Sequence, residues 1–229
     1  MDGPTLSLLA AAIAFVGLHF AMSHPLRPVM VRRLGDQGFQ AVYSLVVLAA
    51  LGWMAWSFWN SDPGAVVLPW GYRAPEWIVA SLLSLIALVL IVAASTPRNP
   101  AMALPGAEAA MAAEPAGALR MTRHPMMWGF ALWGVSHTVA APTARTVIVS
   151  LSVIVLALGG AAAQDAKKRA LLGASWSEWE AKTSFVPRLT RIAAIPPFAW
   201  LVGSILWLAI SWLHGPIGGV PAGIWRWLG

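Results

Sequence analysis

The stretch that decides how this chain folds is RMTRHPMMWGFALWGVSH, residues 120–137. It begins with two arginines and a His-Pro pair at the edge of an apolar run, and it ends with His137 inside that run. Charged groups and imidazoles are costly in hydrocarbon, so inside a membrane they usually line a site, pair with one another or bind a cofactor. The stretch therefore predicts a membrane-spanning helix that carries functional side chains.

The composition of the whole chain also indicates a membrane protein. Of the 229 residues, 59% are hydrophobic and only 10% are charged, which leaves too little polar surface to cover a water-soluble globule. Apolar windows of about 17–25 residues, long enough to cross a bilayer, recur about six times between short polar breaks. We therefore predict an all-α integral membrane protein in which residues 1–229 form a single transmembrane domain of about six helices.

The predicted spans are residues 5–22, 39–59, 76–94, 125–141, 146–163 and 195–213. Between the third and fourth spans, residues 96–117 are too polar and broken to cross the membrane, and they are long enough to fold over a site as a lid. Residues 164–191 are the most polar part of the chain. Within them Trp176 and Trp179 share a helical face, which predicts an amphipathic helix lying at the cytoplasmic membrane surface.

The basic residues predict the orientation. Twelve of the 15 Lys and Arg residues follow the first, third and fifth spans, so the positive-inside rule places these loops in the cytoplasm and both termini outside. We expect a multi-pass protein of a bacterial-type inner membrane. The formal charge of +6 is spread over several loops, which favours contact with membrane lipids and gives no reason to expect nucleic acid.

The histidines are the main candidate metal ligands, because the sequence has no cysteine. His19 and His137 lie inside apolar spans, and two histidines on facing helices can be the axial ligands of haem iron. Trp133 and Gly134 precede His137 on the same helix and would give a flat macrocycle an aromatic wall and a gap. The alternative is that these histidines only hydrogen-bond neighbouring helices. His214, at the outer end of the last span, is expected to be solvated.

The depths of the two buried histidines differ. Counted from the outer surface at 1.5 Å per helical residue, His19 lies about 20 Å deep and His137 about 6–12 Å deep. A shared haem would therefore need a tilted helix or a fourth span that starts below the membrane surface. If His19 is paired with His124 instead, the difference in depth has the opposite sign.

A second set of polar residues lies at the cytoplasmic start of the fourth span. His124 is 13 residues before His137, which is about 20 Å along a helix, so these two residues cannot bind one ion together. With Arg120 and Arg123, His124 could hold a carboxylate, such as a haem propionate, or a phosphate. The other interpretation is that the arginines only anchor the helix at the membrane surface.

One pattern in the sequence combines His19, Arg123-His124-Pro125, Trp128-Gly129 and His137 with the later Gly173, Trp176, Trp179 and Val186-Pro187. Its part from Arg123 to His137 is fairly specific, whereas the later part is shared more widely. This pattern resembles the NnrU family, which is similar to 15-cis-zeta-carotene isomerase. The resemblance implies haem b held by His19 and His137, with cis-trans isomerisation of a lipophilic polyene or a role in nitric-oxide and denitrification metabolism. The isomerase has a proposed cysteine ligand where this chain has Gly134, so that ligand switch cannot occur here.

Two further hypotheses stay open. The Arg-His-Pro motif and the later aromatic residues also resemble membrane methyltransferases of isoprenylcysteine and phospholipids, which implies that Arg123, His124 and residues 164–187 bind S-adenosylmethionine. Alternatively, the protein is a non-catalytic permease or assembly factor. A lipophilic small molecule is the candidate substrate under the isomerase and methyltransferase hypotheses. The candidate cofactor-binding residues are His19, His137, His124, Arg120, Arg123, Trp128, Trp133 and Gly134, and the candidate metal ligands are His19 and His137.

Overall fold

The computed structural model describes residues 2–64, 66–71, 73–95, 99–101 and 109–228. Across these residues the chain is helical, and its only β-type pairing is an isolated bridge between Val66 and Thr143. The long helices are α1 (Gly3–Ser23), α2 (Arg27–Asn60), α3 (Ala74–Ala94), α4 (Pro125–Ala140), α5 (Ala144–Leu172) and α7 (Pro197–Gly218). The short ones are α6 (Ala174–Lys182), α8 (Trp225–Leu228), η1 (Ala109–Ala112), η2 (Gly117–Arg120) and η3 (Leu189–Ala194). The predicted all-α membrane fold is confirmed.

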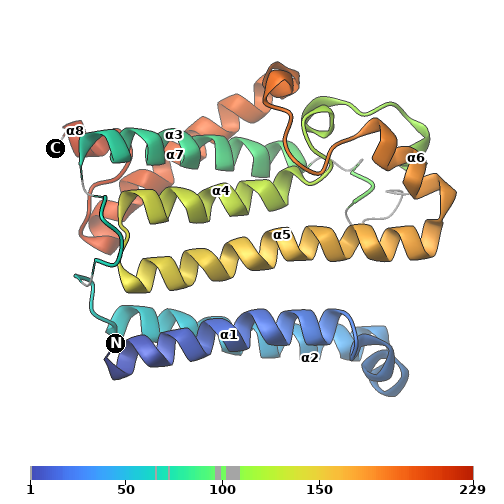
Figure 1. Cartoon of the computed structure of the whole chain (residues 1–229), viewed down its shortest axis with the longest axis horizontal. Helices are drawn as coiled ribbons and strands as arrows, with labels where there is room; N and C mark the ends of the chain where they lie inside the picture. Colours follow the sequence, from blue (N-terminus) through green and yellow to red (C-terminus); the bar gives the residue numbers. More distant parts are fainter. Residues whose placement is uncertain (1, 65, 72, 96–98, 102–108, 229) are drawn as a thin grey trace.

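Within the described residues, five helices are long and apolar enough to cross a membrane: α1, α2, α3, α5 and α7. The predicted fourth span is α4, which has only 16 residues and is about 24 Å long. It nevertheless runs alongside α3 and α5 (Figure 1). The six long helices alternate in direction along the chain, so both termini lie at the same end of the bundle (Figure 1).

The six long helices form a row. Helix α1 packs against α2 and α5, α4 packs against α5 and α3, and α3 packs against α7. Helix α5 therefore separates α1 from α4 (Figure 1). We call the end of the row that holds both termini the terminal end, and the opposite end, where α4 begins, the Arg123 end.

Small residues let neighbouring helices approach closely. A Cβ atom added to Gly129 of α4 would lie 2.8 Å from the carbonyl oxygen of Ala87 in α3. One added to Gly203 of α7 would lie 2.9 Å from the Cα atom of Val89. Close contact of backbones is a usual source of helix association in membranes, where water does not drive apolar surfaces together.

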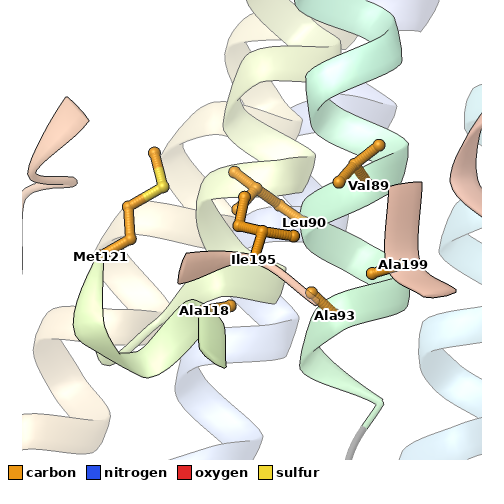
Figure 2. Packing of buried hydrophobic residues seen from close by; sticks show 7 residues of the cluster. All are labelled: Val89, Leu90, Ala93, Ala118, Met121, Ile195 and Ala199. Carbon is orange, nitrogen blue, oxygen red and sulfur yellow. The ribbon is translucent and has the colours of Figure 1, made fainter. Parts of the chain in front are cut away.

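An apolar cluster at the Arg123 end holds the start of α4 in place. Figure 2 shows its residues, which come from the end of α3, the segment before α4, the segment before α7 and the start of α7: Val89, Leu90, Ala93, Ala118, Met121, Ile195 and Ala199. All seven are buried. The cluster fixes the backbone immediately before the Arg-His-Pro motif.

The polar segment after the fifth span does not form one surface helix as predicted. Helix α5 continues through it to Leu172, and only Ala174–Lys182 form the separate helix α6. The side chains of Trp176 and Trp179 are 0% and 1% exposed and pack on Ala101 and Leu119, so the apolar face of α6 is turned into the protein and not toward lipid. The predicted lid lies partly outside the described residues, at positions 96–98 and 102–108.

Candidate functional site

The candidate site lies at the Arg123 end, where the start of α4 meets the polar end of α5 and α6. Its centre is Asp165 of α5, a residue that the sequence interpretation did not single out. The Asp165 side chain is 2% exposed, that of His124 1% and that of Arg123 9%. An ionised group is stable at such burial only when it is paired and hydrogen-bonded.

Each carboxylate oxygen of Asp165 accepts hydrogen bonds from a different residue. Arg123 donates from Nε and Nη2 to Oδ2 at 2.8 and 2.5 Å, and Nε2 of His124 lies 2.7 Å from Oδ1. Because a carboxylate only accepts hydrogen bonds, Nε2 carries a proton, and in the neutral form of the ring Nδ1 carries a lone pair. Nδ1 makes no hydrogen bond within the part of the chain that the structure describes.

Glu180 of α6 extends the network toward the surface. Its Oε1 accepts from Nη2 of Arg123 at 3.1 Å, and Arg169 donates to both of its oxygens at 2.8 and 3.1 Å. The two guanidinium groups therefore balance the carboxylates of Asp165 and Glu180. This pairing ties α4, α5 and α6 to one another.

The segment after α6 covers the network. Thr122 and Trp128 both donate from their side chains to the carbonyl oxygen of Phe185, at 2.7 and 2.8 Å. The Phe185 ring lies 5.4 Å from the His124 ring and 5.6 Å from the Arg123 guanidinium carbon. Trp128 thus positions this cover, and Phe185 shields the two motif side chains.

Of the predicted anion-binding residues, only Arg120 is exposed. It ends η2, and its side chain forms no hydrogen bond or ion pair with the residues that the structure describes. The expectation that Arg123 offers its guanidinium to an external carboxylate does not match its contacts, because Asp165 and Glu180 already occupy it.

His19 lies in the α1–α2 pair. Its Nε2 is 2.7 Å from the hydroxyl oxygen of Tyr43 in α2, while its Nδ1 is buried without a hydrogen-bond partner among the described residues. Its ring also packs edge-on against Tyr43 and Phe15. Tyr43 was not singled out from the sequence.

His137 lies near the terminal end, in the last turn of α4. Its Nδ1 is 2.8 Å from the carbonyl oxygen of Trp133, and the Trp133 ring packs on it with centroids 4.2 Å apart. Its other ring neighbour is His214 of α7, with centroids 6.0 Å apart. His214 is half-buried, and the expectation that it is solvated at the outer rim stays a prediction.

The structure does not bring His19 and His137 together. Phe20, next to His19, packs on α5 at Gly159, whereas Gly134 packs on α5 at Ser150. These two contacts are nine positions apart, which corresponds to about 14 Å along α5, and α5 itself lies between α1 and α4 (Figure 1). The depth mismatch expected from the sequence is thus present, and a single iron atom cannot reach both histidines.

Gly134 also leaves no gap for a macrocycle. A Cβ atom added there would lie 2.9 Å from the carbonyl oxygen of Ser150 and 2.9 Å from the side chain of Ile154. Helix α5 fills the space that the sequence interpretation assigned to haem. The residues present therefore do not fit a haem held between His19 and His137.

The sequence contains signals that point to Asp165 and Glu180. Asp165 directly follows an apolar span, where an ionisable residue indicates a partner on another helix. Glu180 lies in the same helix as two buried tryptophans. What the sequence does not give is the pairing itself, because the paired residues are 42 and 57 positions apart.

One of the three comparisons with known proteins found a match. The family model described as NnrU protein matches residues 7–222. No curated protein and no solved structure matches the chain. Because the family match covers nearly the whole chain, this multi-pass membrane protein belongs to the NnrU family.

Proposed function

We propose that this NnrU-family protein is a membrane enzyme that uses His124 as a general base, and that its reaction is methyl transfer from S-adenosylmethionine to a lipophilic substrate. The observation that carries the proposal is the hydrogen-bonded series Arg123–Asp165–His124 at the Arg123 end. Of the three hypotheses drawn from the sequence, methyl transfer is the one whose residues come together in space.

The His124–Asp165 pair has the arrangement of a general base. A buried carboxylate that accepts from one imidazole nitrogen fixes the tautomer and orientation of the ring, and it stabilises the imidazolium that forms when the other nitrogen takes a proton. Here Nε2 of His124 is held at 2.7 Å by Asp165. Nδ1 is therefore the atom that would accept a proton from the substrate nucleophile.

Arg123 acts on this pair as a positioning residue. Its two hydrogen bonds to Oδ2 keep Asp165 ionised and leave Oδ1 for the imidazole. The Phe185 ring beside both residues excludes water and lowers the local dielectric, which strengthens the hydrogen bonds within the network.

S-adenosylmethionine would supply a methyl group on a sulfonium centre. The donor set fits it at one end, because the exposed guanidinium of Arg120 is available for the carboxylate of the cofactor. A lipophilic substrate is proposed because the helices around the site expose apolar side chains along their length. The distribution of basic residues favours a cytoplasmic Arg123 end in a bacterial-type inner membrane, with both termini outside.

Haem b held by His19 and His137 is not part of this proposal, because these residues lie apart. Polyene isomerisation and nitrogen-oxide chemistry depend on that haem. A purified preparation without a Soret band, after expression with ample haem, is the expected result.

Calorimetry of purified protein with S-adenosylmethionine tests the proposal. We expect micromolar binding, and at least tenfold weaker binding in Arg120→Ala than in the control Arg73→Ala, an exposed arginine at the terminal end. Substitution His124→Gln keeps a donor for Asp165 but removes the base. It should retain cofactor binding and lose transfer of a labelled methyl group to a membrane lipid extract.

Two results would overturn the proposal. The first is no cofactor binding by folded wild-type protein, which would favour a non-catalytic permease or assembly factor. The second is labelled lipid formed equally fast by wild type and His124→Gln. The variant His24→Ala, which changes an exposed histidine at the same end, is the control for nonspecific effects.

A further inference from the structure

We propose that His137 and His214 form a binding site for a late transition-metal ion, Cu²⁺ or Zn²⁺, at the terminal end of the bundle. The two histidines lie near the ends of α4 and α7, and their ring centroids are 6.0 Å apart. The site is separate from the Arg123 network and does not depend on the proposed methyl transfer.

Each of the two rings is held in the same way by its own helix. Nδ1 of His137 lies 2.8 Å from the carbonyl oxygen of Trp133, and Nδ1 of His214 lies 2.8 Å from that of Ile210. A carbonyl oxygen only accepts, so in both neutral rings Nδ1 carries the proton. Each Nε2 is therefore a free lone-pair donor on the side of the ring that points away from its own helix.

This is the form in which histidine binds metal ions. A metal-binding imidazole commonly donates its second N–H to a backbone carbonyl, which fixes the tautomer and the ring orientation. Neither Nε2 is hydrogen-bonded to a described residue. The Trp133 ring packs on the His137 ring, with centroids 4.2 Å apart. The His137 side chain is therefore already held in one orientation before an ion binds.

The separation of the rings suits a shared ion. With metal–nitrogen bonds of about 2.0–2.1 Å, two imidazoles that share one ion have centroids between about 5 Å, at a tetrahedral angle, and about 6.5 Å, at a linear one. The observed value of 6.0 Å lies within this range. Nitrogen donors without thiolates suit Cu²⁺ and Zn²⁺, with Cu²⁺ bound more tightly.

The site has open coordination positions. No group of three or more His, Asp or Glu residues that could hold a metal exists among the described residues, so the protein supplies two ligands here. Water or an external ligand must complete the coordination. With no carboxylate to offset the charge of the ion, we expect micromolar affinity.

Metal titration of full-length protein without a histidine tag tests this proposal. After chelator treatment, we expect one Cu²⁺ per chain with micromolar affinity, and nitrogen hyperfine structure in its paramagnetic resonance spectrum. Both His137→Ala and His214→Ala should weaken binding at least tenfold, and the double variant should be no worse than either single one. The control His24→Ala should bind as wild type does.

Thermal unfolding of each variant shows whether it has folded. If folded His214→Ala binds Cu²⁺ and Zn²⁺ as wild type does, the shared site does not exist. The site is also overturned if His137 and His214 are found to hold haem iron and no free ion. Lost metal binding with unchanged S-adenosylmethionine binding would confirm that the two ends act independently.

Discussion

The two ends of the bundle hold their polar residues in opposite ways. At the Arg123 end, charged side chains are buried and paired across three helices, so each one depends on residues far away in the sequence. At the terminal end, His137 and His214 are each hydrogen-bonded to a backbone carbonyl oxygen of their own helix. Pairing across helices stabilises the fold, whereas pairing within a helix leaves a side chain free to bind something else.

Removing Asp165 should have the largest effect on stability. Asp165→Ala leaves the guanidinium of Arg123 in a buried position with only Glu180 to offset it, and breaking a buried ion pair in this way costs about 3–5 kcal/mol. The free energy of unfolding, measured by denaturant titration in detergent, checks this. The control Asp36→Ala removes an exposed carboxylate that lies 3.7 Å from Arg27 and should change little. Equal stability of the two variants would contradict the role given to Asp165.

Filling the contact between α4 and α5 should have the next largest effect. In Gly134→Ala the new methyl group meets the Ser150 carbonyl and Ile154 at 2.9 Å, and such overpacking costs about 1–3 kcal/mol. The matched control is Gly160→Ala, where nothing lies within 4 Å of the added Cβ atom. The same denaturant titration should show no loss for the control. If Gly134→Ala is as stable as wild type and binds haem, α5 does not fill the space beside Gly134, and the predicted gap for a macrocycle exists.

The sequence predicts the elements of this fold better than their contacts. Apolar windows locate all six long helices, including α4, because burial of backbone polar groups in a bilayer leaves few alternatives to a helix. It also selects His124 and Arg123 as site residues. It does not show that Asp165 pairs with both, since that depends on how α4 and α5 are placed side by side.

The sequence also does not show which helices are neighbours, and this explains why the predicted haem site does not fit the structure. Two histidines in apolar spans suggest a shared ligand, but only the order of helices in the row shows that α5 lies between them. The tryptophans of α6 teach a similar lesson. Their common face is visible in the sequence, whereas the partner of that face, which is protein at Ala101 and Leu119, is not.

Loosening the cover over the Arg123 end should have a smaller effect. Trp128→Phe keeps most of the ring volume but removes the hydrogen bond to the Phe185 carbonyl, which still accepts from Thr122. The expected loss is about 1 kcal/mol. Hydrogen exchange of residues 183–188 should rise in this variant and stay unchanged in Trp56→Phe, a tryptophan exposed on α2. Unchanged exchange in Trp128→Phe would mean that the cover is held by other contacts.

The smallest stability effect is expected at the terminal end. His214→Ala removes only a hydrogen bond to its own helix at Ile210 and a ring contact with His137, so the free energy of unfolding without metal should change by less than about 0.5 kcal/mol. With Cu²⁺ present the outcome differs, because an ion that binds only the folded protein stabilises it by about 2.7 kcal/mol at 100 times its Kd. Wild type should gain that amount and His214→Ala should gain almost none. If His214→Ala changes the free energy of unfolding only when metal is present, His214 has a binding role. If the variant is already less stable without metal, His214 serves packing alone.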